Sequence, residues 1–182
     1  KLDGPVAMAV MERLSGNSLV LDGLTTKHAE ARLHYQEACR YWAKASNVEP
    51  SFIRNGEKVS QPHGRQITFS SNEAAAFAAC LMNSSLFYWL YSVASDCEHI
   101  NDSLVRQFPV PIKWGEKDWL NIAASLNSEL ERYATRKTIT TKQGHRIEYD
   151  EMNASKAKTT IDFIDREIAS CYGLSDIEAD LV

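Results

Sequence analysis

The chain contains 182 residues, of which 44% are apolar, and its formal net charge is −4 at pH 7. This length suits one medium domain, or one domain with an appended helical element, and the apolar share is sufficient for a hydrophobic core. The composition therefore excludes global disorder, and the acidic balance excludes a wholly basic nucleic-acid binder. We expect any nucleic-acid contact to involve only one side of the protein.

Several features bear on the compartment of the protein. The four cysteines, Cys39, Cys80, Cys97 and Cys171, form no CxxC pair and no zinc-ligand spacing, which indicates free thiols in a reducing cytoplasm. The first residues do not resemble a secretory signal, and residue 1 is not methionine, so we expect an excised piece of a longer cytoplasmic protein. The apolar stretch 74–94 is interrupted near its middle, which favours buried helices over a membrane span.

The N-terminal segment, residues 1–26, is predicted to be a helical lead-in. Pro5 suits the first turn of a helix over 6–14, and residues 15–17 (Ser-Gly-Asn) end it. The apolar stretch 19–24 has no clear secondary structure.

Residues 27–115 are predicted to form an α+β domain. Alternating, aromatic and β-branched residues predict strands near 30–37, 40–46 and 65–70. Asn55-Gly56 is a turn signal typical of a hairpin.

The second half of that domain is predicted to be mainly helical. Ser71 or Asn72 caps a helix that runs to Met82, and residues 83–85 (Asn-Ser-Ser) permit a bend before a very aromatic helix. One more helical turn is expected over 102–107, and the prolines that follow it keep 108–111 extended.

Residues 116–182 are predicted to be a helical C-terminal element with a basic hairpin near 137–149. Apolar stripes at helical spacing predict two amphipathic helices, and their members are Trp119, Ile122, Leu126, Leu130 and Tyr133 in the first, and Ile161, Ile164, Ile168 and Cys171 in the second. Gly173 ends the second helix, and Ser175 with Glu178 indicates a capping box. The fold class is therefore α+β, with a small mixed or antiparallel sheet packed by helices and a helical portion after it.

Positive charge is concentrated in two stretches. Residues 27–65 hold seven lysines and arginines against four glutamates, and residues 132–147 hold five against no acid. Such cations contact phosphates, while amide, guanidinium and aromatic side chains suit bases. An ordinary half-exposed sheet explains the first stretch equally, and a solvated turn that balances neighbouring acids explains the second.

The candidate DNA-contacting residues come from these two stretches. Gln36, Arg40 and Asn55 are of types that pair bidentately with a base edge in the major groove. The complete candidate set is Tyr35, Gln36, Arg40, Tyr41, Trp42, Lys44, Arg54, Asn55, Lys58, Arg65, Arg136, Lys137, Lys142 and Arg146, of which the last four are expected to hold phosphates.

Catalytic motifs are missing from the sequence. It contains no GxGxxG, no P-loop, no Asn-Pro-Pro-Tyr tetrapeptide and no convincing Asp…Glu-x-Lys arrangement. Residues 96–99 (Asp-Cys-Glu-His) place a thiol beside an imidazole, but a nucleophile and its base are rarely sequence neighbours, so a turn is the favoured interpretation. We expect no catalytic site, metal or cofactor in this chain.

Four segments together resemble a known family. Residues 81–89 read LMNSSLFYW, residues 95–101 read SDCEHIN, residues 108–111 read FPVP, and residues 160–174 read TIDFIDREIASCYGL. Their order and spacing resemble the C-terminal region of adenine-specific DNA methyltransferases of type IIG-like restriction-modification systems, across roughly residues 30–180. Glu98 departs from that pattern, because the family usually has arginine at this position.

The resemblance implies a target-recognition domain. In that family this region reads the DNA sequence, while an N-terminal Rossmann-like domain binds S-adenosylmethionine and methylates adenine at N6. The implied partners are double-stranded DNA and that methyltransferase domain, and no membrane. The main alternative is a protein-interaction module that docks its helices on a methyltransferase or nuclease partner. An enzyme with an unrecognised site is a second alternative.

Overall fold

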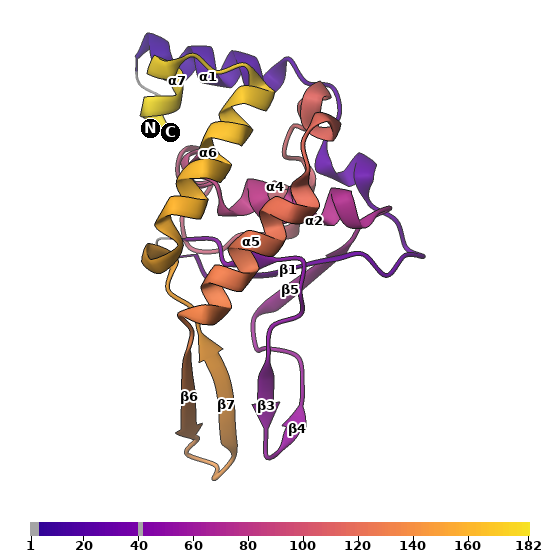
Figure 1. Ribbon diagram of the computed structural model, residues 1–182, viewed down its shortest axis with the longest axis vertical. Helices are drawn as coiled ribbons and strands as arrows, with labels where there is room; N and C mark the ends of the chain where they lie inside the picture. The colour runs from indigo at the N-terminus through magenta and orange to yellow at the C-terminus, as the bar shows by residue number, and fades with distance from the viewer. Residues whose placement is uncertain (1–3, 40–41) are drawn as a thin grey trace.

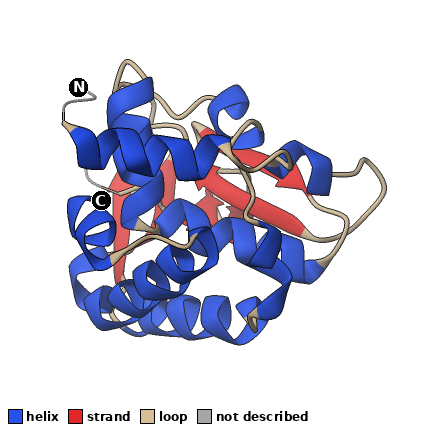
Figure 2. Ribbon diagram, turned by 90° about the horizontal axis from the view of Figure 1, so that it is seen from above, coloured by secondary structure: helices blue, strands red, loops and turns tan. Residues whose placement is uncertain are grey.

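The computed structural model describes residues 4–39 and 42–182 and has the predicted α+β class. Its strands form two antiparallel sheets. Of the two predicted alternatives, mixed or antiparallel, the antiparallel one is therefore present. Viewed from above, helices flank the strands (Figure 2). Sheet 1 lies within the helical body, and sheet 2 projects from it (Figure 1).

Sheet 1 contains β1 (Arg32–Gln36), β2 (Ala45–Ser46) and β5 (Gly64–Thr68), in the order β2-β1-β5. The strands expected near 30–37 and 65–70 are confirmed. In the described part of the strand expected over 40–46, residues 42–44 are not strand, because Lys44 has a φ of 50°, and the pairing with β1 is at Ala45 and Ser46. Residues 40 and 41 lie outside the described part of the chain.

Sheet 2 is built from two hairpins, and we call it the arm. The first hairpin is β3 (Phe52–Arg54) with β4 (Glu57–Lys58), and the second is β6 (Thr135–Thr140) with β7 (Arg146–Glu151). Both hairpins are confirmed predictions. Antiparallel pairing of β3 with β7 joins them into one sheet in the order β4-β3-β7-β6. This pairing connects two segments that the sequence analysis assigned to different domains.

Helix α2 (Asn72–Asn83) is the centre of the body, and every residue from Ala74 to Asn83 is buried. The Ser71 hydroxyl caps it by accepting from the Ala74 backbone N–H at 3.2 Å. It contacts β1 and β2 in addition to helices α5 and α6. The alanines in α2 permit this close packing, since a helix enclosed on all sides needs small residues somewhere on its surface.

A polar joint connects α2 to α3 (Ser85–Ala94) at the predicted bend. The Asn83 side chain donates to the Ala45 carbonyl at 2.7 Å and so ties α2 to β2. The Ser85 backbone N–H and hydroxyl donate to the Asp165 carboxylate at 2.7 and 2.9 Å. Two of the segments that carry the family resemblance therefore meet here, in a structural contact.

The two predicted amphipathic helices are α5 (Trp119–Arg132) and α6 (Lys158–Tyr172). In the α5 stripe Trp119, Leu126 and Leu130 are buried and Ile122 is partly buried. Tyr133 is 44% exposed, because the helix has already ended at residue 132. In α6, Ile164, Ile168 and Cys171 are buried. Gly173 ends α6 in the left-handed conformation with a φ of 65°, as predicted.

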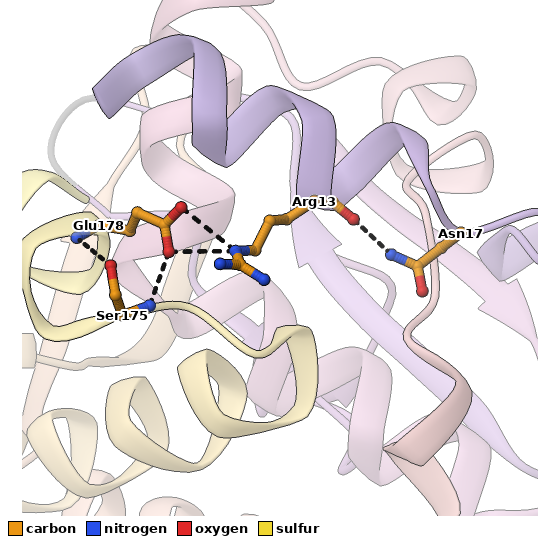
Figure 3. Close-up of polar contacts among 4 residues, drawn as sticks. All are labelled: Arg13, Asn17, Ser175 and Glu178. Atoms are coloured by element: carbon orange, nitrogen blue, oxygen red, sulfur yellow. Dashed lines mark hydrogen bonds and ion pairs between the residues drawn. The ribbon is translucent and has the colours of Figure 1, made fainter. Parts of the chain in front are cut away.

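Helix α1 (Pro5–Ser15) packs beside α7 (Asp176–Leu181) at the end of the molecule away from the arm (Figure 1). The predicted capping box is present in α7, and Arg13 Nε donates to the Glu178 carboxylate at 3.1 Å (Figure 3). Hydrogen bonds from the Ser175 backbone and hydroxyl, together with Arg13, lower the pKa of Glu178. The carboxylate thus joins the first and last helices.

Four short helices complete the fold: η1 (Leu21–Leu24), α4 (Asp102–Arg106), η2 (Ile112–Glu116) and η3 (Ala154–Ala157). Residues 108–110 are extended, as predicted, and pair with residues 19–21. One hydrophobic core includes residues from all three predicted segments, among them Val10, Ile67 and Trp119. Among the described residues no single helix is long and apolar enough to cross a membrane. Helices α2 and α3 taken together have the length and apolar composition of a membrane span, but they are bent by 66° relative to each other.

Candidate DNA-binding surface

The arm ends in two turns that lie side by side, and we call residues 54–57 with 141–146 the arm tip. Asn55 joins the turns, because its Oδ1 accepts from the Arg146 backbone N–H at 2.9 Å and its Nδ2 donates to His145 Nδ1 at 2.9 Å. The Asn55 backbone N–H also donates to the Arg146 carbonyl at 2.8 Å. The Asn55-Gly56 turn has φ values of 53° and 88°, which suit these two residue types. The tip is therefore a single unit.

The arm tip is positively charged. It contains Arg54, Lys142 and Arg146 against Glu57, a balance of 3 − 1 = +2. Arg54 and Lys142 are exposed and have no ion-pair partner within the described residues, while Arg146 pairs with Glu148 at 3.0 Å and is still 65% exposed. The tip can thus offer several cationic side chains to an anionic partner.

The remaining cations of the arm are paired with acids on a neighbouring strand or in the loop before β3. Arg136 contacts Asp150 at 3.0 Å, and Lys137 contacts Glu151 at 3.3 Å. On the other hairpin, Lys58 contacts Glu49 at 2.6 Å. The basic stretch 132–147 is therefore largely neutralised by acids just beyond it in sequence. For Arg136 and Lys137 this agrees with the alternative of a solvated turn that balances neighbouring acids.

A cleft of about 650 Å³ lies where the arm meets the body. Four of the predicted DNA-contacting residues line it, namely Gln36, Trp42, Lys44 and Arg136. Its acidic lining residues are Glu49, Glu131, Asp150 and Glu151. Glu49, Asp150 and Glu151 are paired with Lys58, Arg136 and Lys137, which leaves Lys44 against Glu131. The lining therefore has no excess of positive charge, and the cations within the cleft do not form a phosphate site.

Two candidate residues have structural roles instead of the predicted one. Tyr35 is only 2% exposed, and its hydroxyl donates to Asp102 Oδ1 at 2.6 Å, so it faces the core and cannot reach a base. Burial and the adjacent Asp102 carboxylate raise the pKa of this tyrosine. Asn55 uses both polar atoms of its amide to join the two turns, which leaves its side chain unsuited to bidentate base pairing. Arg40 and Tyr41 lie outside the described residues.

Arg65 belongs to a cluster that sequence reasoning did not find, and we call Glu37, His63 and Arg65 the donor trio. Glu37 Oε1 is 2.7 Å from His63 Nδ1, and Glu37 Oε2 is 2.6 Å from an Arg65 terminal nitrogen. Hydrogen bonds from His63 and Arg65 lower the pKa of Glu37. No sequence signal marked Glu37 or His63, because they lie 26 residues apart and meet only through the pairing of β1 with β5.

The turn at residues 96–101 has the predicted structural role. Asp96 Oδ1 accepts from the Glu98 backbone N–H at 2.9 Å, and Asn101 caps α4 by accepting from the Leu104 N–H at 2.8 Å. Cys97 is exposed in this turn, at a φ of 63°.

The other three cysteines are buried free thiols, as predicted. Burial raises the pKa of all three, that of Cys80 to about 12, so each is held in its unreactive protonated form. In the described part of the chain, no three His, Cys, Asp or Glu side chains come together as a metal site.

Comparison of the chain with protein-family models, with curated proteins and with solved structures finds no match in any of the three.

Proposed function

We propose that the chain is a sequence-specific DNA-recognition domain and that the arm is the part that contacts the duplex. The parent protein in this proposal is an adenine-specific restriction-modification methyltransferase, in agreement with the family resemblance. In this role the chain itself performs no chemistry. The missing catalytic domain supplies S-adenosylmethionine binding and methyl transfer.

The observation that carries the proposal is the arm itself, because it combines a suitable shape with a suitable charge. The major groove of B-DNA is roughly 12 Å wide and admits a β-ribbon, and several DNA-binding proteins read it with strands. Neighbouring strands are about 4.8 Å apart, so either two-stranded hairpin of the arm fits within that width, whereas the four strands together, about 14 Å across, do not. The tip has a net charge of +2 although the whole chain is −4.

The charge of the other surfaces restricts phosphate contact to the tip. The charges that line the cleft behind the arm balance, and the ion pairs of Arg136 and Lys137 leave no unbalanced charge along β6. A phosphate backbone is therefore attracted at the tip and not at the cleft. We assign phosphate contacts to Arg54 and Lys142.

Salt dependence of duplex binding tests this assignment. The magnitude of the slope of log K against log salt concentration should be smaller by about 2 in the double variant Arg54→Gln/Lys142→Gln, because each lost phosphate contact lowers that magnitude by about 1. Lys156→Gln is the control, since Lys156 is an exposed lysine in η3, outside the arm. Unchanged binding by the double variant, or equal loss in the control, would contradict the role of the tip.

A second candidate function is protein interaction at the opposite end of the molecule. Met8 on α1 is 53% exposed, and Ile177 on α7 is 70% exposed. Large apolar side chains on two packed helices suit a protein partner such as the methyltransferase domain. Salt-insensitive association with that domain, combined with no duplex binding, would favour this function over DNA recognition.

A further inference from the structure

The donor trio lies at the base of the arm. Residues 59–63 connect β4 of the arm to β5 of sheet 1, and His63 is in the turn just before β5. Arg65 is on β5, and Glu37 directly follows β1, the strand paired with β5. The trio is therefore placed by sheet 1, which is anchored in the core, instead of by a loose loop.

The carboxylate of the trio is covered, while its two donors face solvent. The exposed fraction of the side chain is 15% for Glu37, 51% for Arg65 and 73% for His63. Glu37 Oε2 accepts from Arg65 Nε at 2.8 Å and from Nη2 at 2.6 Å, so it occupies one edge of the guanidinium. Glu37 Oε1 is engaged by His63 Nδ1. The Nη1–Nη2 edge of Arg65 is left for an external acceptor, whereas His63 Nε2 has no proton to donate when the neutral ring donates to Glu37 through Nδ1.

The balance of charge in the trio favours a base over a phosphate. Glu37 neutralises Arg65, so with a neutral imidazole the net charge of the trio is zero, and its attraction to a phosphate is weak. The guanidinium nevertheless retains two terminal N–H donors in a fixed plane. A fixed planar pair of donors matches the O6 and N7 acceptors of guanine in the major groove.

We propose that Arg65, held in position by Glu37 and His63, reads a guanine in the recognised duplex. In this inference Glu37 is a positioning residue, although as an acid it would ordinarily be counted against DNA contact. The inference rests on the proposed function, and it adds a base identity and a specificity-determining residue to it.

The test is selection of bound duplexes from a random pool by the full chain and its variants. Arg65→Lys keeps the charge but loses the planar fork, and Glu37→Gln keeps the size but loses the carboxylate. Arg32→Lys is the matched control, because Arg32 is the exposed arginine on the neighbouring strand β1. We expect the wild type and Arg32→Lys to select a guanine at one position. Arg65→Lys and Glu37→Gln should lose roughly 5- to 150-fold of that preference, with the salt slope unchanged.

A modified base gives a measurement that does not depend on how well the variants fold. Replacement of the selected guanine by 7-deazaguanine removes the N7 acceptor, so it should weaken wild-type binding and leave Arg65→Lys unaffected. If Arg65→Lys weakens the affinity for all duplex sequences by the same factor and also lowers the salt slope, Arg65 contacts a phosphate and the inference is overturned. Unchanged selection would also overturn it while leaving the proposed function intact. If the wild type binds no duplex, both fail.

Discussion

Asn83 is a polar side chain at one of the most enclosed positions of the protein, and all of its hydrogen bonds are internal. It is 2% exposed, donates to the carbonyls of Ala45 and Ala79 and accepts from the Ala45 N–H. A buried amide with these partners fixes the register of β2 against α2, since any shift would leave a polar group unsatisfied.

Removal of this amide should be costly. Asn83→Ala leaves the buried Ala45 carbonyl without its side-chain donor, so we expect a loss of about 1–3 kcal/mol in the free energy of unfolding. Urea denaturation measures it, with Gln107→Ala at an exposed position as the control. A change of equal size in both variants would show that Asn83 has no special role.

Glu178 should make the stability of the protein depend on pH on the acid side. Because its pKa is lowered in the folded state, its contribution is complete above the unfolded value of 4.5 and is lost as the pH falls through the folded pKa. Thermal unfolding between pH 6 and pH 3 should therefore show a smaller loss of stability in Glu178→Gln than in the wild type. Parallel profiles of stability against pH in the two proteins would show that the contact of Glu178 with Arg13 and Ser175 does not cause the pH dependence.

The single elements were largely predictable, because their signals are local. Ser71, Asn101 and Gly173 mark helix ends by their own chemistry, and Asn55-Gly56 marks a hairpin. The face of a strand was less predictable, since alternation shows that β1 has two faces but not which one is buried. For this reason Tyr35 was predicted at the surface and is found in the core.

The pairing of the two hairpins was not predictable from the sequence. In the sequence, β3 and β7 are separated by the segments that form most of the helical body. Neither strand contains a signal that specifies the other as its partner. The donor trio was missed for the same reason. The acids of β7 entered the sequence analysis only through the solvated-turn alternative. The strand pairing places Glu148 and Asp150, which lie just beyond the basic stretch, opposite Arg136.

The junction at Asn55 should determine how rigid the arm tip is. In Asn55→Ala the Arg146 N–H loses its side-chain acceptor, so its hydrogen exchange should be about 5- to 10-fold faster, as expected for one ordinary hydrogen bond. Gln143→Ala, at an exposed position of the same turn, should leave that rate unchanged. Equal exchange rates in wild type and Asn55→Ala would show that the two turns are independent.

The whole molecule separates its two kinds of surface. The arm carries the positive tip, with the donor trio at its base. Helices α1 and α7 lie at the other end of the molecule (Figure 1), where Met8 and Ile177 are exposed. Between them lies one core built around α2. The segments that carry the family resemblance contribute mainly to that core and to its joint at Asn83–Ser85. The resemblance therefore supports the fold more directly than it supports any contact with DNA.

The most direct test of the account is a map of the backbone amides that a DNA duplex protects from hydrogen exchange. We expect protection at residues 54–57 and 141–146 and at the base of the arm around residues 63–65. We expect none on α1 or α7. Protection confined to α1 and α7, or no protection at any concentration of duplex, would contradict the claim that the arm is the DNA-binding part of this protein.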